Sequence, residues 1–284
     1  MVRPVGRKDI AAYLISEYQM SIRQACKLSS ISRWVYYHRP DKTKDEPVQE
    51  KLRTMAEAHP AYGFWKMYRT IRREQLNWNH KRVYRIYIEL GMNIRRKVKR
   101  RLPKREKHPL NLPMQQNCIW SIDFMSDSLV DGRRFRTLNI IDDFNRESLA
   151  IEVDTNLSSQ RVTRVLGQLA ETRGLPKEIR CDNGPEFVSN YFANWCLENK
   201  IQIKYTQPGK PVQNAYIERF NKSYRAEVLN AYLFHTINDV RELTEEFIIN
   251  YNNNRPHESL NNLTPIDFLK SEGAFQKIES NFTG

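Results

Sequence analysis

Three acidic residues stand where a folded chain would bring carboxylates together: Asp123, Asp182 and Glu218. Asp123 lies in the middle of an apolar stretch, WSIDFMS, that reads as a strand, and Asp182 ends another, EIRCD. Glu218 follows on a predicted helix, with 35 residues between it and Asp182. Carboxylate oxygens are the ligands that hard divalent cations prefer. Delivered to a common edge by two strands and a helix, these acids would hold a pair of such cations.

The surroundings of the acids carry more weight than their spacing, because the chain is rich in Asp and Glu. An unpaired carboxylate within a buried strand is costly, so Asp123 needs a reason to be there. The Asn-Gly and Gly-Pro pairs in CDNGPEF are turn signals that would hold Asp182 at the mouth of its strand. No Ser-His or Cys-His constellation accompanies the acids, and two-metal chemistry needs none.

Other polar residues near these segments have simpler interpretations. Asp142 and Asp143 end a predicted strand and read as turn or capping residues. We expect Glu186 to cap the helix after Asp182 rather than to bind metal. A lone histidine such as His257 is more often structural than functional. Trp120 and Trp195 are predicted to be core residues.

The elements that must position the acids begin at about residue 117, where the pattern changes to alternating strand and helix. Three strands come first and look antiparallel; strand-helix alternation follows. This order predicts an α/β fold, a mixed sheet flanked by helices. The expected strands are 118–126, 135–144, 148–154, 177–182 and 201–206, and the expected helices are 158–174, 186–200 and 213–233.

The first part of the chain reads as helices. Ser21 and Ser32 can cap two short helices in residues 8–38, a helix-turn-helix pattern. A second helical unit spans residues 48–92, where Asn79 would cap the last helix and Gly91 would end it. Its aromatic residues, Trp65 among them, are expected in its core. The predicted segments are residues 1–40, 47–94, a basic linker 95–112, a core 113–235 and a C-terminal helical extension 236–284.

Charge divides the chain unequally, although the whole carries +13. Residues 1–110 have a net charge of +17 and residues 111–284 one of −4. This asymmetry indicates a nucleic-acid-binding region joined to a region of different function. The basic run RRKVKRRLPKREK would bind phosphates without sequence preference. The four cysteines form no Cys-x-x-Cys pair, which favours reduced thiols over zinc or disulfides. No apolar run approaches membrane-spanning length, so we expect a cytoplasmic protein that does not engage a membrane.

The segments WSIDFM, CDNGPEF and QNAYIERFNKSYR resemble the three acidic motifs of integrase-core (DDE) transposases, which have a ribonuclease-H-like fold. The resemblance is nearest to the second-reading-frame (OrfB) products of the bacterial insertion-sequence-three family. It extends to HPAYGFWKMYRTIRRE, which is similar to their helix-turn-helix segment, and to YNNNRPHESLNNLTPIDFL, similar to their C-terminal signature. Together these stretches run from about residue 20 to residue 270.

The resemblance implies that Asp123, Asp182 and Glu218 bind two Mg²⁺ ions, for which Mn²⁺ would substitute. It implies cleavage at the ends of an insertion element and strand transfer into a target duplex. A nucleoid-associated multimer on double-stranded DNA is expected, with fusion to or association with an upstream reading-frame product. The residues expected to contact DNA are Asn183, Gly184, Asn214, Asn221, Lys222, Arg225, Lys81, Arg82, Arg85, Arg95, Arg96, Lys97, Lys99, Arg100 and Arg101.

Two alternatives stay open at this point. The first is a non-catalytic DNA-binding regulator, which would keep the helical units and have a catalytically inactive core. The presence of all three acids at fitting positions argues against it. A nuclease of the same fold without strand transfer would not need two helical DNA-binding units upstream.

Overall fold

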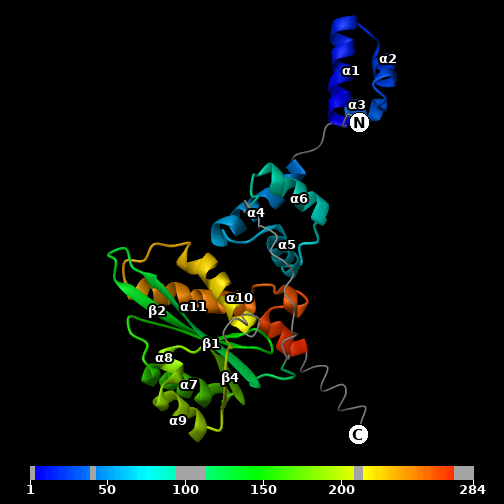
Figure 1. Ribbon diagram of the computed structural model, residues 1–284. Coiled ribbons are helices and arrows are strands. Elements are labelled where there is room, and N and C mark those ends of the chain that lie inside the picture. Colours follow the sequence, from blue (N-terminus) through cyan, green and yellow to red (C-terminus); the bar gives the residue numbers. More distant parts are fainter. Residues whose placement is uncertain (1–3, 39–42, 94–112, 208–213, 272–284) are drawn as a thin grey trace, which may run out of the picture. The chain divides into compact units, whose positions relative to one another are not determined.

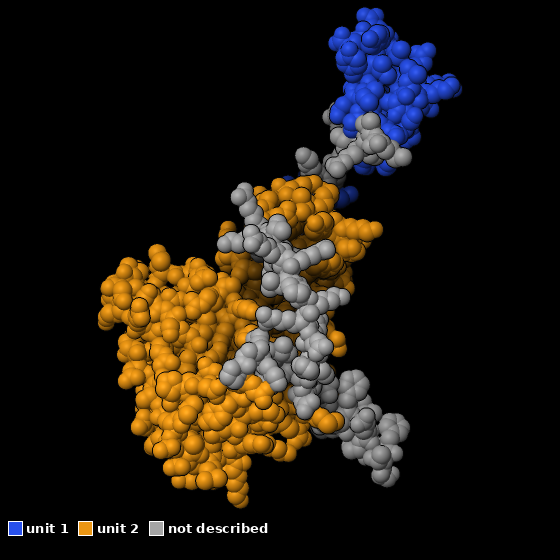
Figure 2. All heavy atoms as spheres, in the orientation of Figure 1, with its two compact units in different colours: residues 1–51 blue, residues 52–284 orange. Residues whose placement is uncertain are grey.

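The protein is described by a computed structural model that covers residues 4–38, 43–93, 113–207 and 214–271. It forms two compact units, Met1–Lys51 and Leu52–Gly284, coloured separately in Figure 2. None of the helices in these ranges combines the length and the apolarity that crossing a bilayer requires. The described cysteines, which are all four of the chain, are free thiols, as predicted.

The first unit contains α1 (Pro4–Tyr18), α2 (Ile22–Leu28), α3 (Arg33–Tyr37), the short turn η1 (Thr43–Asp45) and the beginning of the next helix. Ser21 caps α2 in a reciprocal capping box with Gln24, and Ser32 caps α3 by accepting from the Val35 N–H. Both predicted caps are therefore confirmed. Such caps satisfy backbone donors that a helix start leaves without partners.

Three further helices follow: α4 (Glu46–Ala58), α5 (Phe64–Arg73) and α6 (His80–Glu89). Asn79 caps α6 as predicted, and Gly91 closes it with a φ of 68°, a conformation that glycine adopts without strain. Met67 and Ile71 of α5 are buried. Trp65 is 54% exposed, so its assignment to the core was wrong. It lies on the polar side of α5 and stacks on His80.

The second unit is built around a five-stranded mixed sheet (Figure 1). Strands β1 (Ile119–Ser128), β2 (Arg134–Asp142) and β3 (Ser148–Asp154) are antiparallel. Strand β4 (Glu178–Cys181) runs parallel to β1, and β5 (Gln202–Tyr205) runs parallel to β4. The spatial order is β3-β2-β1-β4-β5, which places β1 in the middle of the sheet. The predicted mixed sheet is confirmed.

Helices cover both faces of the sheet, and each face has its own apolar core. Figure 1 shows α7 (Ser159–Arg173), α8 (Pro185–Val188) and α9 (Asn190–Glu198) on one side, packed on residues such as Trp120 and Ile122. On the other side lie α10 (Ala215–Tyr224), η3 (Arg225–Leu229) and α11 (Ile237–Asn253), and the short turn η4 (Glu258–Leu260) follows. Successive residues of β1 face opposite layers, as a strand requires.

Two predicted helices differ from those observed. The expected helix 186–200 is broken at Ser189, whose extended backbone ends α8 and whose hydroxyl caps α9. The expected helix 213–233 changes to a π-helical turn at Arg225–Leu229. The wider turn lets Tyr224, Val228 and Leu229 all reach the same core.

A buried ion pair joins β4 to the turn after β2. Arg180 Nη1 donates to Asp143 Oδ2 at 2.8 Å, and the two side chains are 5% and 0% exposed. Burial raises the pKa of Asp143 to about 6, while Arg180 opposes that rise. The positive charges of Arg180, which bonds to the carboxylate directly, and of Arg146 favour its ionised form.

We expect Arg180→Met to lower the free energy of unfolding by about 3 kcal/mol at pH 8, because it leaves a buried carboxylate without its cation. The loss should be smaller at pH 5, where Asp143 takes up a proton and becomes neutral. Urea unfolding at both pH values measures this difference. Arg161→Met, which removes a half-exposed pair with Glu152, should cost no more than about 1 kcal/mol. Equal losses for Arg180→Met at both pH values would contradict the explanation.

Candidate active site

Asp123 occupies the central strand, on the face covered by α10 and α11. It pairs in register with Asn139 of β2. Asn221 of α10 donates from Nδ2 to Asp123 Oδ2 at 2.7 Å, and its Oδ1 accepts from Asn139 Nδ2 at 2.7 Å. The Phe124 N–H donates to Asp123 Oδ1 at 2.9 Å. A chain of amides therefore fixes the orientation of this half-buried carboxylate.

Asp182 follows β4 directly and is exposed. Its Oδ1 accepts from the Gly184 N–H at 2.9 Å, which closes the predicted turn. Asn183 donates from its side chain to the Thr206 carbonyl at 3.4 Å. Gly184 has ordinary backbone angles, φ −59° and ψ 149°, so it is not needed for a left-handed conformation. It is needed for space, because a Cβ there would lie 2.9 Å from Asp182 Oδ1.

Glu218 lies in the first turn of α10 and is half-buried. Its charge is felt at Asp123, whose pKa is raised to about 6. Burial is the largest cause of this rise, the negative charge of Asp182 comes next, and Glu218 adds a smaller contribution. The Phe124 N–H and the Asn221 amide oppose it. Asp182, which follows β4, and Glu218 on α10 thus both act electrostatically on Asp123 in β1.

The three carboxylates are not arranged as a closed metal cage. In the part of the chain that the structure describes, no group of three or more His, Cys, Asp or Glu side chains is gathered closely enough to hold a metal ion. The oxygens of Asp123 are held by Phe124 and Asn221, and one oxygen of Asp182 by Gly184. The chemistry of the donors nevertheless fits a hard cation, because the charges of Asp182 and Glu218 help to raise the pKa of Asp123 and a positive charge would oppose that rise.

The residues expected to contact DNA lie in three places: near the acids, on α6 and in the basic run. Those near the acids differ in their surroundings. Lys222 is exposed on α10, whereas Arg225 is engaged by Asp127 Oδ2 at 3.0 Å and the Ser126 carbonyl at 2.9 Å. Asn221 is used by the amide chain at Asp123. Asn214 is buried at the start of α10, where its Oδ1 has no hydrogen-bond partner among the described residues.

The other expected contacts belong to α6 or to the basic run. Lys81 is exposed, Arg82 is half-buried, and Arg85 Nη1 donates to Glu89 at 3.0 Å. The remaining residues lie outside the described part of the chain: Arg95, Arg96, Lys97, Lys99, Arg100 and Arg101. Contact of any of these side chains with DNA stays a prediction.

Several secondary interpretations can now be compared with the structure. Asp142 accepts from the Asn117 and Phe144 N–H groups, which confirms its role in a turn. Glu186 pairs with Arg136, and the N-cap position of α8 is occupied by Gly184 with no side-chain cap, so the expected cap was wrong. His257 is buried and its pKa is lowered to about 3, mainly by burial, which makes it a neutral structural residue.

Sequence reasoning missed Asn139 as a supporting residue. It is fully buried in β2, and its only described side-chain hydrogen bond is to Asn221. An asparagine within the apolar run TLNIID was a usable signal, because a buried amide requires partners. Its partner could not be identified from the sequence, since Asn221 is 82 positions away.

Comparison with known proteins places these features in a family. Residues 113–211 and 199–265 match models described as integrase core domain, and residues 43–101 match an HTH-like domain. An uncharacterized 31.7 kDa protein of insertion element IS407 from Burkholderia multivorans is 40% identical over 257 residues, which cover 90% of this chain and 92% of that protein. An uncharacterized transposase-like protein from Haemophilus influenzae is 25% identical over 206 residues, covering 69% and 95%.

Among solved structures, the HTLV-2 integrase catalytic core domain in complex with magnesium is similar with a TM-score of 0.42 and 17% identity. The match covers 56% of this chain and 99% of that one.

We expect Gly184→Ala to weaken Mg²⁺ or Mn²⁺ binding about 10-fold or more, because the new Cβ displaces the Asp182 carboxylate. Isothermal titration calorimetry of the full chain measures this. Gly167→Ala is the matched control, since a Cβ at that position meets nothing within 4 Å. Unchanged binding in Gly184→Ala would show that the position of Asp182 does not matter for the metal.

In EDTA at pH 8, Asp123→Asn should raise the free energy of unfolding by about 2 kcal/mol. The folded protein holds the Asp123 proton more tightly than the unfolded chain, so this residue destabilises the fold progressively as pH rises from about 4 to above 6. The stability gain of Asp123→Asn should disappear at pH 3.5, where Asp123 of the wild type is protonated in the folded protein and mostly protonated in the unfolded chain. Denaturant melts at the two pH values test it, and a variant less stable than wild type at pH 8 would refute it.

Proposed function

The chain belongs to the insertion-element transposases with an integrase core, the OrfB kind of the insertion-sequence-three family, and from this we propose that it cleaves and rejoins DNA phosphodiester bonds at the ends of such an element. The observation that supports the proposal most is the raised pKa of Asp123, whose causes include the charges of Asp182 and Glu218. Acids from β1, β4 and α10 act on one another at the middle of a ribonuclease-H-like sheet.

Asp123, Asp182 and Glu218 would hold two Mg²⁺ ions, with Mn²⁺ as a substitute. Bound there, such ions lower the pKa of an attacking water or 3′-hydroxyl and stabilise the leaving oxygen of the phosphodiester. Asn221 and Asn139 hold Asp123 in one orientation, and the Gly184 N–H holds Asp182. These hydrogen bonds keep the acids from turning to bulk water when DNA arrives, which is the role of supporting residues around metal ligands.

Double-stranded DNA is the proposed substrate, both as element ends and as target. The HTH-like segment and its basic residues Lys81, Arg82 and Arg85 would grip the duplex, and the basic segment from Arg95 to Arg101 would add contacts to phosphates. Asn183, Gly184, Asn214, Asn221, Lys222 and Arg225 are proposed to line the path of DNA near the acids. A multimer on DNA, in the nucleoid, would bring two ends together. Fusion to or association with an upstream reading-frame product would assist that assembly.

The decisive experiment compares wild type with Glu218→Gln on supercoiled DNA that carries the element's own ends, with Mg²⁺. We expect cleavage and joining by the wild type and a loss of about 10³-fold or more in the variant, with DNA binding retained, because a metal ligand is removed. Glu245→Gln, an exposed position on α11, is the matched control and should behave as wild type.

Other outcomes have definite meanings. Cleavage without joining would favour a nuclease of the same fold. DNA binding with neither cleavage nor joining, also when the chain is fused to the upstream reading-frame product, would favour a regulator and refute the proposal.

A further inference from the structure

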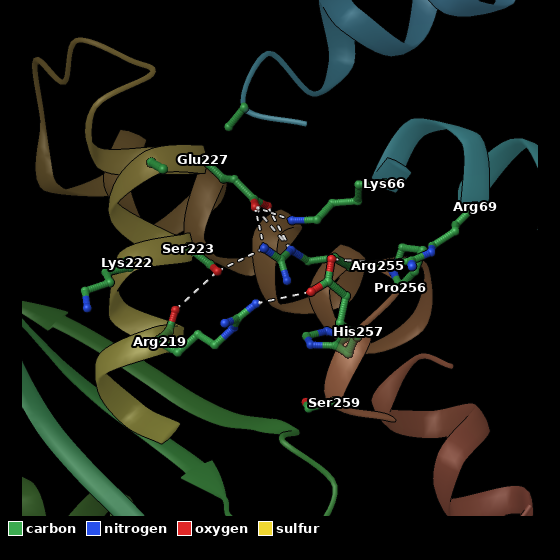
Figure 3. Close-up of a pocket in the computed structure, with 13 residues that line it drawn as sticks. Lys66, Arg69, Arg219, Lys222, Ser223, Glu227, Arg255, Pro256, His257 and Ser259 are labelled. Carbon is green, nitrogen blue, oxygen red and sulfur yellow. Dashed lines mark hydrogen bonds and ion pairs between the residues drawn. The ribbon is translucent and has the colours of Figure 1, made fainter. Parts of the chain in front are cut away.

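A cationic pocket lies beside α10, the helix that carries Glu218, within the second compact unit (Figure 3). Its volume is about 380 Å³, ample for an anion with its waters, since one water occupies about 30 Å³. Helix α5, helix α10 with η3, and the segment after α11 form its walls. Five cations face two carboxylates in it: Lys66, Arg69, Arg219, Lys222 and Arg255 against Glu227 and Glu258.

Glu227 is committed to the base of this pocket. Its Oε1 accepts from Arg255 Nη2 at 2.8 Å and from Arg255 Nε at 3.1 Å, and Lys66 Nζ lies 3.7 Å away. The side chains of Arg255 and Glu227 are 9% and 12% exposed. Arg255 also donates to Ser223 Oγ. A pair so deeply buried and so fully bonded is part of the fold, and an incoming ligand would not replace it.

Glu258 is placed very differently. It is 68% exposed, and its two oxygens face different arginines: Oε1 lies 3.5 Å from Arg69 Nη1 and Oε2 lies 4.0 Å from Arg219 Nη2. Figure 3 shows Arg219 reaching from α10 into the pocket. One carboxylate thus sits between guanidinium groups from two helices, which is where an anionic ligand would sit. Ion pairs this long and this exposed contribute little, so the carboxylate can be displaced.

The pocket keeps unneutralised positive charge even with Glu258 in place. The pKa of Lys66 is lowered to about 8, mainly by burial, with the positive charges of Arg255 and Arg219 lowering it and Glu227 raising it. A second anion entering beside Lys66 would therefore be favoured. Guanidinium groups match a phosphate through paired hydrogen bonds.

The position of the pocket on α10 indicates the source of the phosphate that it would bind. Arg219 follows Glu218 directly in α10, and Lys222 lies one turn further along. A DNA strand whose reacting bond lies at Glu218 would carry neighbouring phosphates past this side of the helix.

We propose that Arg69 and Arg219 bind a backbone phosphate of the DNA strand entering the active site, and that Glu258 occupies this position until the DNA displaces it. The proposal deepens the proposed function and rests on it for the identity of the ligand. Arg69 comes from the HTH-like segment and Arg219 from the integrase core. A single phosphate would therefore link the two regions when DNA is bound.

The test measures binding of a fluorescein-labelled 30-base-pair duplex of arbitrary sequence to the full chain, in EDTA and at several salt concentrations. Glu258→Gln should bind about 3-fold more tightly, because an internal competitor is removed. Arg69→Gln and Arg219→Gln should each bind more weakly, with the slope of log K against log salt reduced by about 1. All three positions lie at or near the surface, and thermal melts verify that each variant is folded.

Asp131→Asn is the matched control, because it removes an exposed carboxylate paired with Arg133 in the turn between β1 and β2. It changes the net charge as Glu258→Gln does and should leave binding unchanged. In the Arg69→Gln/Arg219→Gln background, Glu258→Gln should bring no gain. A gain that persists there, or an equal gain from Asp131→Asn, would show a general charge effect and overturn the proposal.

Inorganic phosphate, titrated at constant ionic strength, separates a DNA phosphate from a free anion. Competition with the duplex that is stronger in Glu258→Gln than in wild type supports the proposal. Phosphate binding that leaves the DNA affinity of every variant unchanged overturns it in favour of a free-anion site. The binding test is done without metal, so it is independent of catalysis. If the variants change DNA binding as expected but the wild type neither cleaves nor joins DNA with Mg²⁺, only the proposed function is refuted. Glu218-dependent cleavage with unaffected variants refutes only the phosphate site.

Discussion

The site depends on the incomplete compensation of one half-buried negative charge, that of Asp123. Asp123 is carried by the central strand, where its neighbour Ile122 contributes to an apolar core. Asn221 and the Phe124 N–H stabilise its ionised form, yet burial and the charge of Asp182 outweigh them and raise its pKa to about 6. More hydrogen bonds would make the fold more stable and the carboxylate less attractive to a cation. The sheet therefore holds Asp123 in a state that a bound divalent ion would stabilise, a common conflict between stability and function.

Helix α10 divides its sides among three tasks, and its period makes this possible. One stripe packs into the core beneath α11: Ile217, Phe220 and Tyr224. The next faces β1, where Glu218 acts electrostatically on Asp123 and Asn221 bonds to Asp123; Arg225, the first residue of η3, continues this side and pairs with Asp127. The third lines the cationic pocket: Arg219, Lys222 and Ser223. A shift of the helix along its axis would disturb the core, the acids and the pocket together, so packing fixes the chemistry.

How far the sequence predicts this arrangement depends on the range of each interaction. The caps at Ser21, Ser32 and Asn79 could be predicted because a cap involves residues two or three positions apart. The strands that carry Asp123 and precede Asp182 could be predicted because apolar runs and turn residues are local signals. Contacts between distant residues could not, and these include the Asn139–Asn221 bond and the Glu258 bridge between α5 and α10. The break at Ser189 and the π turn were missed because packing, not propensity, decides them.

In the pocket, cations from the basic part of the chain pair with carboxylates from the acidic part. Lys66 and Arg69 belong to the basic first part of the sequence, and Glu227 and Glu258 to the acidic remainder. Between the two parts, Lys66 lies 3.7 Å from Glu227, which is buried and already bonded to Arg255, whereas Arg69 lies 3.5 Å from the exposed Glu258. Arg73 adds a further link from α5 to Asp267 at 2.6 Å. A polyanion competes only for the exposed pairs, because the buried ones lie beyond its reach. The same surface can therefore release Glu258 to admit DNA while α5 stays attached to the core.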